Sequence, residues 1–269
     1  QSHRVGLYVH YSETHDNERL ARIGRDWSLL RNRLCALTSV SGDFGFTCGV
    51  EWLAAEKVNV HSSRGLAWGH EPNLVRELAQ LNRLLAHHPS FFDNAALTRL
   101  SGPEDHVLAL RRVSDEGLDQ SLVLVNTDPK IARSITLCEE TWMKLGAPHH
   151  DLLGQPTPAI KKRAGRVELF LEAGESFCLA TASEPQGLAG DAYRELRAQA
   201  AWAITMITRR IRVRDISTFD WRQMARLVQA GAKPFLTAVS HLDPALVKED
   251  VLAALKQAVA VDLFPQVVT

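Results

Sequence analysis

The sequence has little that points to nucleic acid or to a membrane. Its 31 basic and 31 acidic residues give a formal net charge of +0, and neither sign forms a long run. It therefore lacks the basic surface that binds a phosphate backbone. The longest apolar window, residues 200–207, is far too short to cross a bilayer. We expect no nucleic-acid partner and no membrane span.

Features of secreted proteins and of cofactor sites are also missing. Residues 1–7 have no basic start, apolar middle or small-residue cleavage site, so a cytoplasmic location is the default expectation. The four cysteines show no close pairing. The histidine pairs at 87–88 and 149–150 stand without a cysteine pair, which favours surface histidines over a metal site. No phosphate loop, dinucleotide fingerprint or serine-nucleophile elbow occurs. The sequence predicts no cofactor and no bound metal.

The chain is long enough for a sizeable core, with 269 residues of which 45% are hydrophobic. Residues 5–11 are almost continuously apolar, as in a strand buried on both faces of a parallel sheet. Residues 26–40 repeat apolar side chains at helical spacing, residues 44–48 read as a short strand, and residues 73–88 as a second amphipathic helix. The first part of the chain therefore predicts two strand-helix units.

From about Ala96 onward, short β-type runs alternate with turn residues, which predicts an antiparallel sandwich. The expected strands are residues 106–113, 120–127, 132–138, 166–173 and 176–182. Helical patterns return in the tail, at residues 191–211, 221–230 and 244–261. Asp243 before Pro244 predicts a helix N-terminus. The tail reads as a small helical domain, as a linker packed on the sandwich, or as the start of a downstream module.

The phrase "ETHDN" at residues 13–17 follows the first strand directly. With the order of elements behind it and "LNRLLAHHP" further along, it resembles the end of the catalytic barrel of the α-amylase superfamily, glycoside hydrolase family 13. The resemblance implies a mixed α/β fold. It comprises the last two strand-helix units of a (β/α)8 barrel over residues 1–95, an antiparallel β-sandwich over 96–183, and a helical C-terminal segment over 184–269. "ETHDNERLA" and "FGFTCGVEWLAAEKVNVH" are similar to segments of large multidomain bacterial α-glucan enzymes, sometimes joined to a glycogen-debranching module.

The resemblance also implies roles for two adjacent residues. Retaining glycosidases use a nucleophilic carboxylate and an acid/base carboxylate about 5 Å apart. Amylase-like enzymes add a third carboxylate, which stabilises the transition state. The resemblance implies this role for Asp16, and it implies for His15 the role of a hydrogen-bond donor to the sugar. Thr14 departs from the family's usual Asn. The nucleophile and the acid/base lie on earlier strands of the family's barrel, so we expect a C-terminal part of a longer enzyme, inactive alone.

Two further residues are candidates for the sugar site. Glu51 and Trp52 follow the second strand, and Trp52 either stacks on a pyranose ring or packs on the barrel rim. Asp16 has a structural alternative, as N-cap of the next helix. The expected partner is an α-1,4-glucan or maltooligosaccharide. The chain is then part of a hydrolase or transglycosidase, or else a noncatalytic scaffold or glucan-binding module. Self-association through an unpaired edge of residues 5–11 is also expected.

Overall fold

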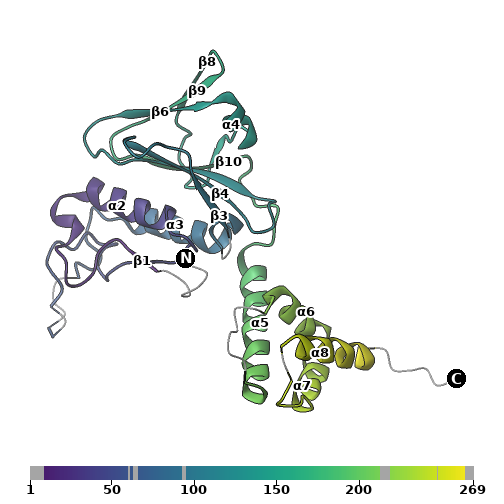
Figure 1. Cartoon of the computed structure of the whole chain (residues 1–269). Coiled ribbons are helices and arrows are strands. Elements are labelled where there is room, and N and C mark those ends of the chain that lie inside the picture. The colour runs from purple at the N-terminus through teal and green to yellow at the C-terminus, as the bar shows by residue number, and fades with distance from the viewer. Residues whose placement is uncertain are drawn as a thin grey trace. The chain divides into compact units, whose positions relative to one another are not determined.

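The computed structural model describes residues 9–59, 61–62, 66–92, 95–212, 219–246 and 248–263. The chain divides into two compact units, Gln1–Ala189 and Gly190–Thr269 (Figure 1). The first mixes helices and strands and the second is helical over its described residues, so the prediction of a mixed α/β chain is confirmed. Of the strand expected at residues 5–11, residues 5–8 lie outside the described part. Val9 and Tyr11 are 50% and 59% exposed, so burial on both faces is wrong for the described end of this strand.

The first unit begins with two short parallel strands. Strand β1 (His10–Tyr11) pairs with β2 (Phe44–Gly45), and His10 lies opposite Phe44. Between them come the 3-10 helix η1 (Leu20–Arg22) and helix α2 (Arg25–Leu37). Because the strands are parallel, the segments that leave them start at the same edge of the pair.

Helix α3 (Val75–His87) follows, then the 3-10 helix η2 (Pro89–Phe91). The apolar face expected for α3 is buried, including Leu78, Leu81 and Leu84. The helix ends where Pro89 forces its predecessor out of the helical region, and His88 has φ −90° and ψ 124°. Apolar spacing and one proline therefore account for the position and length of α3.

Two antiparallel sheets complete the first unit. Their strands are β3 (Ala96–Arg99), β4 (Val107–Val113), β5 (Gln120–Asn126), β6 (Arg133–Cys138), β7 (His150–Asp151), β8 (Ala159–Arg163), β9 (Arg166–Leu171) and β10 (Ser176–Ala180). One sheet has the order β3-β4-β5-β10-β7 and the other β6-β9-β8. The short helix α4 (Glu139–Lys144) follows β6.

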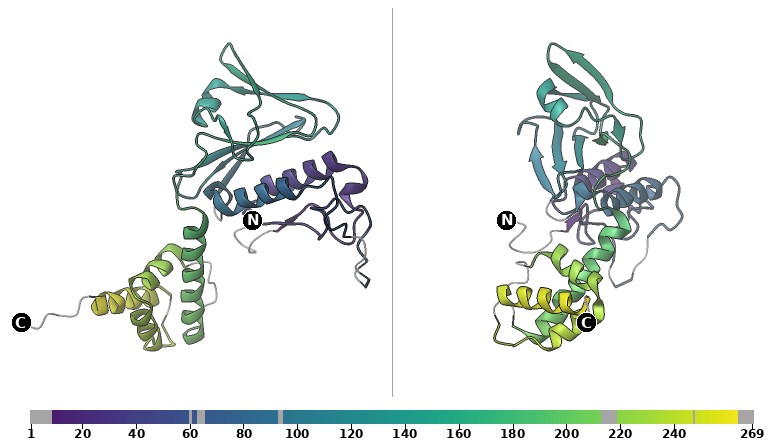
Figure 2. Two further views of the ribbon diagram at one scale, coloured as in Figure 1. Left: turned by 180° about the vertical axis from the view of Figure 1, so that it is seen from behind. Right: turned by 90° about the vertical axis from the view of Figure 1, so that its right-hand side faces the viewer.

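Strand β5 is buried on both faces and lies between two cores. Val123 and Val125 pack into the cluster formed with α2 and α3, whereas Leu122 and Leu124 pack with residues of the three-stranded sheet. Since side chains alternate across a strand, one strand contributes to both cores. The five-stranded sheet is thus the middle layer, with helices α2 and α3 on one side (Figure 1, Figure 2).

The second unit is built from helices α5 (Gly190–Arg210), α6 (Trp221–Ala230), α7 (Ala232–Ser240) and α8 (Lys248–Leu263). Ile207, Phe235 and Leu255 are fully buried in its core. No helix in the described part of the chain is long and apolar enough to span a membrane.

The helix start expected at Asp243 and Pro244 is wrong. Helix α8 begins at Lys248, and the Asp243 carboxylate accepts a hydrogen bond from the Ala245 backbone N–H at 2.9 Å. That contact forms a local turn, which is the usual alternative for an aspartate before a proline. Helix α7 was not anticipated, and neither were β3, β7, β8 and α4. Strand β8 is mostly polar and exposed, so it lacks the alternating pattern that marks a strand.

Candidate functional site

The predicted His15–Asp16 pair lies at the tip of a tight turn that leaves β1. The Thr14 hydroxyl donates to Asn17 Oδ1 at 2.7 Å, and the Asn17 N–H donates to the Thr14 carbonyl at 3.1 Å. His15 Nε2 lies 3.4 Å from Asp16 Oδ1, and their side chains are 54% and 81% exposed. Both side chains are therefore open to a ligand from solvent.

Asp16 does not cap a helix. The N-cap residue of η1 is Arg19 and that of α2 is Gly24. The structural alternative for Asp16 is therefore wrong, and its carboxylate remains available at the turn. Its role as a transition-state stabiliser stays a prediction.

A buried ion pair closes the base of this turn, and sequence reasoning did not anticipate it. Glu13 Oε1 lies 2.7 Å from Arg19 Nε, with the two side chains 2% and 1% exposed. The other carboxylate oxygen accepts the Leu20 N–H at 2.7 Å. Burial raises the pKa of Glu13, while the Leu20 N–H and the Arg19 charge act in the opposite direction. The sequence offered only one signal, two opposite charges flanking the turn, which is also common on surfaces.

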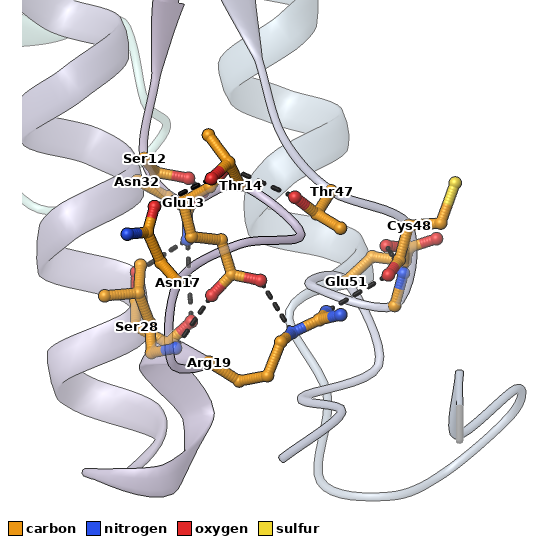
Figure 3. Close-up of polar contacts among 12 residues, drawn as sticks. Ser12, Glu13, Thr14, Asn17, Arg19, Ser28, Asn32, Thr47, Cys48 and Glu51 are labelled. Carbon is orange, nitrogen blue, oxygen red and sulfur yellow. Dashed lines mark hydrogen bonds and ion pairs between the residues drawn. The ribbon is translucent and has the colours of Figure 1, made fainter. Parts of the chain in front are cut away.

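The same arginine ties the turn to the segment after β2 (Figure 3). Arg19 Nη2 donates to the Cys48 carbonyl at 3.1 Å, and the Thr47 hydroxyl donates to the Glu13 carbonyl at 3.2 Å. Figure 3 shows Arg19 reaching from Glu13 on one side toward Cys48 on the other. The chain segments that leave the two parallel strands are thus held together by side-chain contacts.

Glu51 lies in the segment tied by these contacts. Its carboxylate accepts the Gly49 N–H at 3.0 Å, and its carbonyl accepts the Leu74 N–H at 2.8 Å. Gly49 has φ +89°, and a Cβ there would lie 2.9 Å from the Leu66 carbonyl oxygen. Only glycine suits this close approach.

Trp52 packs against a second tryptophan that the sequence did not single out. The ring centroids of Trp52 and Trp68 are 6.3 Å apart with planes tilted by 55°, and Trp68 is 69% exposed. Among the described residues, no hydrogen bond or ion pair joins His15 or Asp16 to Glu51 or Trp52. Roles for Glu51 and Trp52 in ligand binding stay predictions.

No group of three His, Cys, Asp or Glu side chains is arranged to hold a metal ion within the described ranges. The described contacts of this region are instead hydrogen bonds, ion pairs and aromatic pairs. Exposed His15 and Asp16 can exchange hydrogen bonds with a polar ligand, and the exposed face of Trp68 can pack on an apolar one.

No protein family model and no curated protein sequence matches the chain. Among solved structures, the acarbose-soaked debranching enzyme of Nostoc punctiforme aligns at 15% identity with a TM-score of 0.50, over 65% of this chain and 34% of that one. An α-amylase from H. orenii aligns at 14% identity with a TM-score of 0.47, over 66% of this chain and 41% of that one.

A maltogenic α-amylase from Thermotoga neapolitana aligns at 17% identity with a TM-score of 0.48, covering 65% of this chain and 41% of that one. The chain therefore spans less than half the length of each of these three structures. At such identities the likeness concerns the fold alone. We conclude that part of this mixed α/β chain shares the fold of part of the Nostoc debranching enzyme.

Proposed function

We propose that this chain contributes one corner of an α-glucan site in a retaining glycoside hydrolase or transglycosidase of the α-amylase superfamily. The observation that carries the proposal is the exposed His15–Asp16 pair on a turn at the carboxyl edge of a parallel strand pair. Barrel enzymes build their active sites at that edge. Asp16 stabilises the developing positive charge and His15 donates a hydrogen bond to the sugar.

The proposal includes an assignment of the chain's parts. Residues 1–95 are the last strand-helix units of an amylase-type barrel, residues 96–183 the β-sandwich, and residues 184–269 a helical segment or the start of a further module. Support comes from the parallel pairing of β1 with β2, each strand followed by a helix in sequence, and from the antiparallel sheets after them. The shared fold with part of the Nostoc enzyme agrees with this assignment.

The nucleophile and the acid/base carboxylate come from outside this chain in the proposed enzyme. Glu51 and Trp52 contact the glucan in the same proposal, since their segment leaves the strand next to the one that carries His15 and Asp16. The substrate is an α-1,4-glucan or maltooligosaccharide. Self-association through an edge of the first strand stays a prediction, which light scattering of the purified chain tests.

A second function, a noncatalytic glucan-binding module, is favoured by one observation. Trp68 is 69% exposed and packs on Trp52, so an aromatic face is open to solvent. Exposed indole rings are unfavourable in water and pack well against the apolar face of a sugar ring.

Titration of the purified chain with maltoheptaose tests both functions. We expect saturable binding in calorimetry and in ligand-observed NMR. His15→Ala should weaken that binding. Cellobiose, which has β-linked glucose, serves as the control ligand and should not compete. The absence of any saturable maltoheptaose signal would contradict both functions for this chain.

A further inference from the structure

We propose that Glu13 and Arg19 are positioning residues that set the place of the His15–Asp16 turn relative to the Thr47–Glu51 segment. The side chains of Glu13 and Arg19 are only 2% and 1% exposed, so the pair lies beneath the surface that a ligand can reach. The expected effect of this pair on ligand binding rests on the proposed function. Its effect on the position of the turn does not.

Two contacts of the Glu13 carboxylate close the turn. Glu13 precedes the turn and Arg19 follows it, and their side chains meet with Oε1 and Nε 2.7 Å apart. The second carboxylate oxygen accepts the Leu20 N–H at 2.7 Å. One carboxylate oxygen therefore forms an ion pair with Arg19 and the other accepts a directional hydrogen bond from Leu20, so both oxygens hold the chain beyond the turn.

Two hydrogen bonds connect the turn to the neighbouring segment. Arg19 Nη2 donates to the Cys48 carbonyl at 3.1 Å, and the Thr47 hydroxyl donates to the Glu13 carbonyl at 3.2 Å. One residue further on, the Gly49 N–H donates to the Glu51 carboxylate at 3.0 Å. A continuous set of contacts thus runs from the base of the His15–Asp16 turn to Glu51 (Figure 3).

Two charged residues occupy a buried place that apolar residues could also fill. Replacing a buried ion pair by apolar residues of similar volume is often neutral or stabilising, because the desolvation of two charges is avoided. Stability alone therefore gives little reason for an ion pair here. Directional contacts fix the register between segments, which apolar packing does not. A positioning role accounts for the buried pair where a stability role does not.

The experiment uses the full chain with NMR and thermal melting. The double variant Glu13→Gln/Arg19→Met removes both charges together and leaves no unpaired buried ion. Arg133→Met is the matched control, since it breaks the remote Asp128–Arg133 ion pair of 2.8 Å in the same unit. Thr47→Val is a milder second variant that removes only the hydroxyl contact to Glu13, with Thr205→Val, at an exposed position of α5, as its control.

For the double variant we expect at least tenfold faster hydrogen exchange at the Asn17 and Leu20 amides, and shifted resonances of the His15 ring and of the Gly49 amide. Thr47→Val should shift the same resonances by less. The controls should leave all of them unchanged. Variants that melt at a lower temperature but keep these resonances and exchange rates in the folded state would overturn the inference, because the pair then stabilises without positioning.

Ligand binding separates this inference from the proposed function. If the wild-type chain binds maltoheptaose, the double variant should bind it at least fivefold more weakly, and unchanged affinity would contradict the positioning role. If the wild-type chain does not bind, the proposed function fails. The exchange rates and the His15 and Gly49 resonances still decide the inference in that case.

Discussion

Arg112 donates a hydrogen bond from Nη1 to the Leu37 carbonyl at 3.1 Å, which joins strand β4 to the last residue of helix α2. The same nitrogen donates to the Ser39 carbonyl at 2.7 Å, and Nε donates to the Ser90 carbonyl at 2.9 Å. Arg112 is 0% exposed, and its guanidinium lies 4.2 Å from the centre of the Phe91 ring. Carbonyls at a helix C-terminus attract a cation. One buried side chain thereby connects the central sheet to the helical layer.

Loss of Arg112 should destabilise the chain strongly. Arg112→Met leaves the carbonyls of Leu37, Ser39 and Ser90 buried without this donor, and each unsatisfied group costs about 1–3 kcal/mol. We expect the free energy of unfolding to fall by about 3 kcal/mol or more in urea denaturation. Arg111→Met is the control on the same strand, because Arg111 is only half-buried and donates to Gln120. A loss for Arg112→Met no larger than that of the control would contradict the connecting role.

Burial of His88 predicts a pH-dependent stability. Desolvation lowers the pKa of His88 from its ordinary value of 6.5 to about 4, although Asp119 acts in the opposite direction. The Ser90 N–H donates to His88 Nδ1 at 3.3 Å, which requires that nitrogen to be unprotonated. The folded state therefore prefers neutral His88. Its contribution to stability is complete above pH 6.5 and decreases as the pH falls toward 4.

The loss should reach about 3 kcal/mol at the acid end, from 1.36 kcal/mol for each pKa unit. Urea denaturation at several pH values between 4 and 7 measures it, and His88→Gln should flatten the dependence in that window. His106→Gln is the control, since His106 is exposed and is not among the groups that shift the pKa of His88. Equal slopes for wild type and His88→Gln would show that another group titrates.

The exposed position of Asp16 predicts a variant that keeps the fold. Asp16→Asn should change the free energy of unfolding by less than about 0.5 kcal/mol, because the side chain is 81% exposed. We also expect the chain alone to show no glycosidase turnover of maltoheptaose, assayed by released reducing ends. Turnover that disappears in Asp16→Asn would contradict the second expectation, since the chain would then hold a complete catalytic site.

The aromatic pair gives a test of glucan contact that does not involve the carboxylates. Trp68→Ala should weaken maltoheptaose binding by roughly tenfold, whereas Trp68→Phe should retain most of it, because an aromatic face contributes about 0.5–1.5 kcal/mol beyond area burial. Tryptophan fluorescence and calorimetry measure the affinity. Leu118→Ala, at another exposed apolar residue, is the control. Equal affinity of Trp68→Ala and wild type would exclude Trp68 from the binding surface.

Several elements followed from local sequence. The spacing of leucines in α3 and the proline after it predicted that helix, and α6 has the expected bounds of Trp221–Ala230. The long β-type runs of β4, β5, β6, β9 and β10 were also found. The Asp243 prediction failed because an aspartate before proline satisfies a turn as well as a helix start. Helix α7 was missed entirely, so local patterns alone were incomplete even in the helical unit.

The sequence by itself determined that His15 and Asp16 follow a strand. It left open whether Asp16 binds a ligand or caps the next helix. Apolar periodicity and strand ends are properties of neighbouring residues, so they can be read along the chain. The tertiary structure decided that Asp16 caps no helix, that Glu13 and Arg19 are buried as a pair, and that Trp68 packs on Trp52. Glu13 and Arg19 are six residues apart and Trp52 and Trp68 sixteen, so each pair meets only because the chain between its members folds back. Those contacts depend on how the strands pair and the helices pack, which no local pattern specifies.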